Sequence, residues 1–237
     1  MGNTKRAVMM VVVLLAVTVG LWAQRPGRGG MGGMFGNMPT MPGLQNPTVG
    51  SGAEYVMNTK GKEMDVATVV LGKEDVNGSP GYWMEMRMTS PDLGGEMVMK
   101  SLTVVSATES GVKRMIIQRP GQPPMEMSGM MMSMMQQHQG QPTTPAAGGG
   151  GKGDRGELVG TESVTVPAGT FSCQHYRSQG NNGPVDVWVS MEVTPYGMVK
   201  MTSPDSSMAL KKVLTNETSH IHGEPQKMPD MPGMPPH

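Results

Sequence analysis

The sequence has a single cysteine, few aromatic residues and no excess of charge of either sign. The lone cysteine, Cys173, excludes an internal disulfide and a multi-cysteine zinc site. Because 19 basic residues balance 19 acidic ones, and phosphate affinity comes from clustered Lys and Arg, we expect no nucleic-acid partner. The motifs of serine hydrolases, HExxH metalloproteases and phosphate-binding loops are also missing. These absences favour a protein that is not an enzyme and holds no cofactor.

Long apolar runs are missing too, except at the N-terminus. Lys5 and Arg6 precede an apolar stretch that ends with Ala23, and the chain then turns polar at Gln24. This order predicts a cleaved signal peptide over residues 1–23. A retained anchor is the alternative, since the stretch is at the short edge of what spans a bilayer. No cysteine follows it, so we expect a bacterial protein that is periplasmic or secreted, not a lipoprotein and not an integral membrane protein after cleavage.

Glycine, proline and methionine are abundant, with 34, 20 and 29 residues in the 237-residue chain. Three segments are rich in them and poor in other apolar residues, and we predict that they are disordered. The segments are 24–51, a linker at 136–156, and a tail at 223–237. The remainder, 52–222, is expected to form one β domain interrupted by the linker.

Short segments with alternating apolar side chains fill this domain, separated by turn residues. We expect ten strands, at residues 54–60, 64–72, 82–89, 96–105, 112–118, 157–166, 170–178, 185–191, 198–202 and 207–214. Asn77-Gly78 predicts a tight hairpin turn. Without amphipathic helices between the strands, the sequence predicts a mainly β protein built as a single curved antiparallel sheet or a half-closed, open barrel.

Two of these strands alternate strictly, and the alternation assigns their faces. The apolar sets are predicted to line an apolar, ligand-facing interior: Tyr82, Met84, Met86 and Met88 in one strand, and Val185, Val187, Val189 and Met191 in the other. Trp83 and Trp188 fall on the polar sides. Glu85 and Arg87 are assigned to a solvated face, because burying unpaired charges costs several kcal/mol each, by rough estimate.

Two pairs of residues could be catalytic, but structural roles explain both pairs better. Cys173 and His175 point to one face of a strand and could act as nucleophile and base, but a buried free cysteine is more often a core residue beside Phe171. Glu85 and Asp186 could form a carboxylate pair, but solvated strand faces explain them better.

Residues 166–201 carry a family resemblance. The runs VPAGTFSCQHYR, VDVWVS and PYGMVKM resemble the C-terminal half of exported bacterial domains of unknown function, similar to the lipoprotein-localisation-factor (LolA/LolB-type) open barrel. The resemblance implies a concave sheet that holds acyl chains or other apolar ligands. It therefore favours an exported, non-enzymatic protein that binds a lipid, another apolar small molecule or an envelope protein.

Methionine supports an alternative function, since soft thioethers select Cu(I). A periplasmic copper-binding protein would use the Met- and His-rich segments outside the strands. Its candidate ligands are Met131, Met134, Met135 and His138, with Met228, Met231 and Met234 in the tail. His220 and His222 could join such a site, although a histidine pair in a tail is more often solvated.

Overall fold

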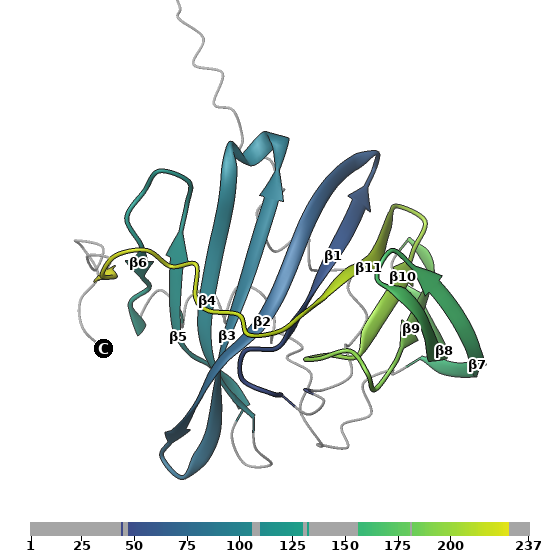
Figure 1. Ribbon diagram of the computed structural model, residues 1–237, viewed down its shortest axis with the longest axis horizontal. Helices are drawn as coiled ribbons and strands as arrows, with labels where there is room; N and C mark the ends of the chain where they lie inside the picture. Colours follow the sequence, from purple (N-terminus) through teal and green to yellow (C-terminus); the bar gives the residue numbers. More distant parts are fainter. Residues whose placement is uncertain are drawn as a thin grey trace, which may run out of the picture.

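The part of the chain that the structure describes forms a single twelve-stranded sheet, whose strands are labelled in Figure 1. The computed structural model describes residues 44, 47–105, 110–129, 132, 156–180 and 182–227. Along the sheet the strand order is β12-β6-β5-β4-β3-β2-β1-β11-β10-β9-β8-β7. All neighbouring strands are antiparallel except β6 and β12, which are parallel.

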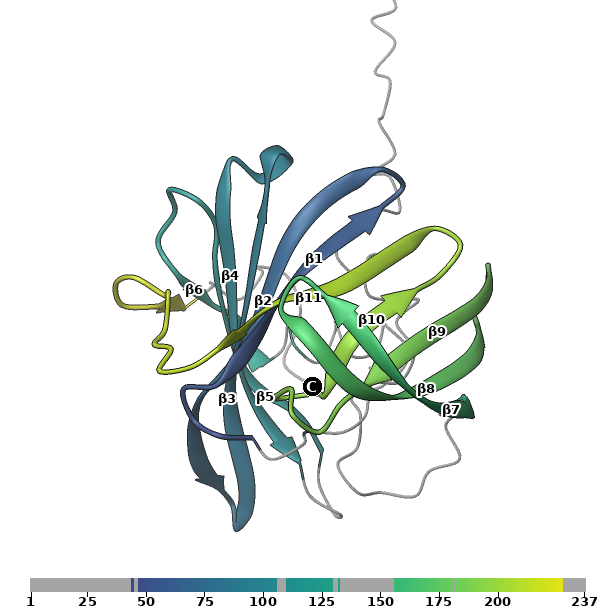
Figure 2. The same cartoon turned by 45° about the vertical axis from the view of Figure 1, so that its right-hand side comes forward.

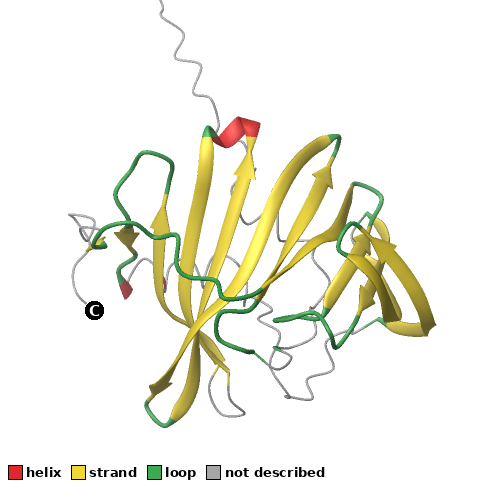
Figure 3. Ribbon diagram, in the orientation of Figure 1, coloured by secondary structure: helices red, strands yellow, loops and turns green. Residues whose placement is uncertain are grey.

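The strand bounds match the ten predicted strands closely. They are β1 Gly52–Thr59, β2 Lys62–Val76, β3 Ser79–Ser90, β4 Gly95–Val105, β5 Ser110–Gln118, β6 Met125–Glu126, β7 Glu157–Val166, β8 Gly169–Gly180, β9 Gly183–Val189, β10 Met198–Thr202, β11 Ser206–Leu214 and β12 Gln226–Lys227. The short pair β6 and β12 was not predicted, and β12 lies at the start of the predicted tail. A single 3-10 turn, Pro91–Leu93, separates β3 from β4 (Figure 3). None of the helices in the described residues is long and apolar enough to cross a membrane.

The sheet is strongly curved, in agreement with the predicted fold class. Strands β7 to β10 run at a large angle to strands β2 to β5 (Figure 2). The turn between β7 and β8 bends back to β11, where the backbone N–H of Ala168 donates to the carbonyl of Leu210 at 3.2 Å. The C-terminal strands therefore curl towards closure, whereas β12 and β7 lie at opposite ends of the sheet.

The tight turn between β2 and β3 has the sequence that its backbone requires. Asn77 and Gly78 both have positive φ, 55° and 81°, which is the requirement of a type I′ hairpin turn. The Asp75 carboxylate accepts the N–H of Gly78 at 2.9 Å. The predicted hairpin is confirmed at these two residues.

The main core covers the inner face of the sheet. Cross-strand partners share a face, and one row of four buried methionines runs across four strands: Met201 of β10, Met208 of β11, Met57 of β1 and Met64 of β2. Since the protein has few aromatic residues, methionine fills much of this core, where its flexible thioether adapts to irregular gaps.

Candidate functional site

The inner face of the sheet carries seven of the eight side chains that were predicted to line the interior. Met88 opposes Val66, Val66 opposes Tyr55, and Tyr55 opposes Leu210. Leu210 lies two residues from Met208 on the same strand. Met208 opposes Met201, and Met201 opposes Val187. The two alternating strands therefore present their apolar sets to one continuous face. Met84, Met88, Val185, Val187 and Val189 are buried there.

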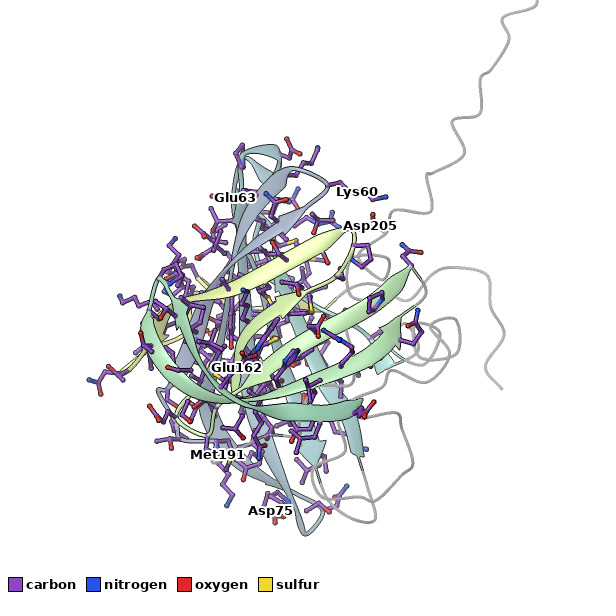
Figure 4. The ribbon with its side chains drawn as sticks, turned by 90° about the vertical axis from the view of Figure 1, so that its right-hand side faces the viewer. Lys60, Glu63, Asp75, Glu162, Met191 and Asp205 are labelled. Carbon is purple, nitrogen blue, oxygen red and sulfur yellow. The ribbon has the colours of Figure 1, made fainter. Side chains whose placement is uncertain are left out.

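Met191 does not belong to this set, so its assignment was wrong. Strand β9 ends at Val189, and the side chain of Met191 is 70% exposed. The chain turns after Ser190, whose N–H donates to the carbonyl of Gly197 at 2.7 Å. The two-residue period therefore stops before position 191 and no longer fixes a face there (Figure 4).

One row of the inner face is only half-buried. Met86 of β3 opposes Met99 of β4, Met99 opposes Ile117 of β5, and Ile117 opposes Met125 of β6. All four side chains keep part of their surface exposed among the described residues. Tyr82, on the same face of β3, is also half-buried. This row is a partly exposed apolar surface on the inner face.

The outer face of the same strands differs from the prediction. Glu85 is 0% exposed and Arg87 is 6% exposed, although both were assigned to a solvated face. Residues 217–222, here called the strap, cover them (Figure 1). The physical reason is pairing: Arg87 Nε donates to Glu85 at 2.9 Å, so neither charge is buried alone.

The strap is held by side chains of three strands. Arg87 donates to the Glu217 carboxylate and to the carbonyl of Thr218, both at 2.7 Å. Glu85 accepts the Ser219 hydroxyl at 2.6 Å and the N–H of His220 at 2.9 Å. Further along, the imidazole Nδ1 of His220 lies 2.8 Å from Glu96 of β4.

At its far end the strap is fixed by β5. The side-chain amide of Gln118 accepts the N–H of His222 at 2.8 Å and donates to the carbonyl of the same residue at 3.1 Å. The strap therefore satisfies the buried pair: Glu217 and Thr218 accept from Arg87, and Ser219 donates to Glu85. Gln118 and Glu96 hold the strap beyond it. His220 and His222, considered as metal ligands, serve this contact.

A groove of about 280 Å³ opens beside the strap. Ala67, Leu214 and the guanidinium of Arg87 line it together with acidic and basic side chains. These are Glu54, Asp65, Glu96, Glu217, Lys212 and His220, with Thr89 completing the lining. The Lys211 ammonium neutralises Glu54 and Asp65 at 2.9 and 2.8 Å, and most of the residues that line the groove are charged.

A second polar cluster surrounds His175 on β8. Its Nε2 lies 2.6 Å from Asp186 and its Nδ1 lies 3.2 Å from Glu162, and its ring stacks on Trp188 with centroids 4.4 Å apart. Burial raises the pKa of the Asp186 carboxyl, but hydrogen bonds from Arg177 and His175 outweigh it and leave that pKa below its ordinary value. Figure 4 looks onto this half of the molecule and labels Glu162.

Cys173 is a core residue, as the structural reading predicted. It is fully buried in the cluster that contains Phe171, and its Sγ contacts the carbonyl of Phe171 at 3.6 Å. Burial, and then the charges of Glu162 and Glu192, raise the pKa of the thiol. Because both nitrogens of His175 face carboxylates, the histidine is not arranged to activate the thiol as a nucleophile.

The two tryptophans lie on the polar sides, as predicted, and both are engaged. Trp83 donates to Glu74 at 2.8 Å, with Lys100 and Arg114 each 5.3 Å from its ring centroid. Lys200 lies 5.0 Å from the ring of Trp188. Cation–π contacts of this kind cover the ring faces. Glu85 and Asp186 lie on β3 and β9, which are separated by four strands, so the two carboxylates do not form a pair.

The proposed copper ligands fall outside the described part of the chain. Met131, Met134, Met135, His138, Met228, Met231 and Met234 all belong there, and the copper hypothesis stays a prediction. Within the described residues, no group of three or more His, Cys, Asp or Glu side chains is arranged to hold a metal ion.

Comparison with known proteins gives distant structural similarity. No family model matches the sequence, and no curated protein matches it. A solved protein provisionally described as a lipoprotein, from Parabacteroides distasonis, aligns over 75% of this chain and 99% of its own, at 13% identity and a TM-score of 0.34. A provisionally exported protein with a YmcC-like fold, from Bacteroides fragilis, aligns over 73% and 99% with the same identity and TM-score.

Proposed function

We propose that this protein is an exported, non-enzymatic β protein that binds an apolar ligand, a lipid or acyl chain, on the inner face of β3 to β6. The observation that supports this proposal is the half-buried row of Met86, Met99, Ile117 and Met125. Burying the rest of this apolar surface is favourable by about 25 cal/mol per Å². Methionine side chains also adapt to ligands of different shape.

Export is proposed from the signal-like segment at residues 1–23. The resemblance of residues 166–201 to open barrels that hold acyl chains points to the same class of ligand. An envelope protein is the other partner that an apolar, half-open surface would suit.

The test is native mass spectrometry of the mature chain purified from a bacterial envelope. We expect a co-purifying lipid on the wild type. Met99→Gln places a polar amide in the row and should lower lipid occupancy several-fold, by an estimate of about 1 kcal/mol for the lost apolar contact. Met191→Gln is the matched control, because that side chain is 70% exposed and lies off the row.

The proposal is contradicted if the wild type carries no lipid, or if Met99→Gln and Met191→Gln carry as much as the wild type. Circular dichroism of the variants should show unchanged β structure, so that loss of ligand is separated from loss of fold.

A further inference from the structure

The half-buried row of the inner face ends at the edge of the sheet where strand β12 lies. This row consists of Met86, Met99, Ile117 and Met125. Strand β12 pairs in parallel with β6, and Gln226 opposes Met125, the last member of the row. The N–H of Gln226 also donates to the carbonyl of Pro124 at 2.9 Å. Because side chains two apart share one face of a strand, the next inner-face position is residue 228, a methionine. The chain beyond β12 therefore begins at one end of this row.

Prolines end the β ladder just after this point. Pro229 has no backbone N–H to donate to a ladder, and it disfavours a helical backbone at the residue before it. Further prolines stand at positions 232, 235 and 236. A chain of this composition favours polyproline II, which is extended and makes no internal hydrogen bonds. We therefore expect residues 228–237, here called the Met-Pro segment, to leave β6 in this conformation.

The methionines of the Met-Pro segment recur at every third position, as Met228, Met231 and Met234. Polyproline II has three residues per turn and rises ~3.1 Å per residue, so these side chains share one side of it about 9 Å apart. Strands are spaced ~4.8 Å apart, so alternate strands lie about 10 Å apart. A segment that crosses the strands from β12 would therefore bring Met231 to Ile117 of β5 and Met234 to Met86 of β3. From residue 228 to residue 234 the segment spans about 19 Å, which matches four strand spacings from β12 to β3.

The chemistry of the two surfaces agrees with their spacing. The row presents thioether and aliphatic side chains that keep part of their surface exposed, and the segment offers thioethers and proline rings. Methionine adapts its shape to an irregular apolar neighbour. A polyproline II segment is already extended before it docks, so little conformational entropy is lost on docking. Apolar grooves bind proline-rich segments in this manner.

From the register of β12 and the spacing of the methionines we propose that the Met-Pro segment docks across the half-buried row of its own chain and competes there with the apolar ligand. The competition rests on the proposed function, whereas the docking does not. An apolar ligand must then displace the segment. If the segment is docked about nine-tenths of the time, the apparent Kd for the ligand rises about tenfold.

Disulfide trapping tests the docking without any ligand. In a Cys173→Ala background, we expect Met86→Cys with Met234→Cys to form a disulfide under mild oxidation, since docking brings the two positions to bonding distance. The control pairs Met234→Cys with Lys100→Cys. Lys100 is half-buried like Met86 but opposes Glu85 on the outer face. Its strand lies one position nearer to β12, so reach alone would favour the control. We expect the inner-face pair to form its disulfide at least about tenfold faster.

Titration with a fluorescent fatty acid tests the competition. A chain that ends at Lys227 lacks the Met-Pro segment, and we expect it to bind the fatty acid about tenfold more tightly than the full mature chain. The full chain carrying Met231→Ser and Met234→Ser should approach the shortened chain. Gly233→Ser is the matched control, because residue 233 lies off the methionine side of the segment, and it should bind like the wild type.

The two experiments separate the docking from the proposed function. Equal rates of disulfide formation for the two pairs, in variants whose circular dichroism matches the wild type, would overturn the docking. Equal fatty-acid affinity of the shortened and full chains would overturn the competition. Should the inner-face pair cross-link while neither chain binds the fatty acid, the docking is supported, and both the competition and ligand binding on the row are wrong.

Discussion

Glu85 and Arg87 are charged, yet together they form the centre of a buried hydrogen-bond network. Strand alternation placed these residues opposite the methionines, and that assignment of faces is correct. The exposure expected for them is not, because a segment about 130 residues away in sequence covers them. Alternation reports which side of a sheet a residue occupies, and it carries no information on what covers that side.

The first prediction concerns the loss of this pair. Arg87→Ala should lower the free energy of unfolding by about 3–5 kcal/mol, because Glu85 would remain buried without its counter-charge. Urea unfolding measures the change. Lys62→Ala, which breaks an ion pair in which both side chains are largely exposed, should leave the midpoint almost unchanged. Equal midpoints for the two variants would show that the strap does not seal the pair.

The buried Tyr55 and the half-buried Tyr196 are expected to give the protein a pH dependence on the alkaline side. Burial raises the pKa of Tyr196 to about 12. Burial, with a smaller contribution from Tyr196, also raises that of Tyr55, whose hydroxyl donates to the carbonyl of Met198 at 3.1 Å. Because both pKa values are higher in the folded than in the unfolded chain, their stabilising effect is complete below the ordinary value of about 10. It is lost as the pH rises through the folded values.

We therefore expect stability to fall between about pH 10 and 12. Spectrophotometric titration should show tyrosinate from Tyr196 only as the protein unfolds. Tyr196→Phe should flatten the alkaline decline while leaving stability near neutral pH little changed. A decline of equal steepness in this variant would assign the loss to other groups.

At the scale of elements, the strands follow from the sequence to an unusual extent. Residues 82–89 and 185–189 show the two-residue period, and both lie in strands whose apolar sets share the inner face. The turn residues Asn77 and Gly78 mark a hairpin for steric reasons that are local to the chain. Side-chain alternation and turn residues are properties of short sequence segments, so both can be recognised from the sequence alone.

Features that depend on contacts far apart in the chain were not accessible in this way. Strand β6 and strand β12 are two residues each, and their pairing joins segments about 100 residues apart. The strap shows no alternation of apolar and polar side chains, because it is held by hydrogen bonds to distant side chains and not by a β ladder. One signal could have suggested the strap. Residues 217–220 are polar, and the alternating strand at 82–89 contains two charged residues, Glu85 and Arg87, that would need partners if buried.

A prediction at this scale concerns the β2–β3 turn. Gly78→Ala should lower the free energy of unfolding by about 1–2 kcal/mol, since φ of 81° is unfavourable for an L-residue with a Cβ atom. No neighbouring atom would contact the added Cβ, so the cost is that of the backbone alone. Gly160→Ala, also with open space around it and without positive φ, is the matched control in urea unfolding and should be neutral or slightly stabilising. Similar losses for both variants would argue against the type I′ turn.

At the scale of the whole molecule, β1 and β11 unite two blocks of sequence. Residues 52–126 form β1 to β6 as a continuous meander, and residues 157–214 form β7 to β11. The ladder between Gly52–Thr59 and Ser206–Leu214 joins them over the full length of β1. The hydroxyl of Tyr55 adds a bond to the carbonyl of Met198. The core runs across this junction, because Met57 and Met208 are buried partners in it.

This junction predicts that the covalent connection between the two blocks is dispensable once the protein has folded. A protease site inserted within the predicted linker, at residues 140–150, should be cut without loss of β structure. The two fragments should elute together under native conditions and separate in urea. The physical reason is that the cut leaves the β1–β11 ladder and the buried methionine row intact, and we expect this contact to outweigh the association entropy that cutting the chain introduces. Met57→Asp, which places a charge in the shared core, is the comparison: after cutting, its fragments should separate without denaturant. Separation of the wild-type fragments in native buffer would show instead that the linker, and not the sheet, holds the two blocks together.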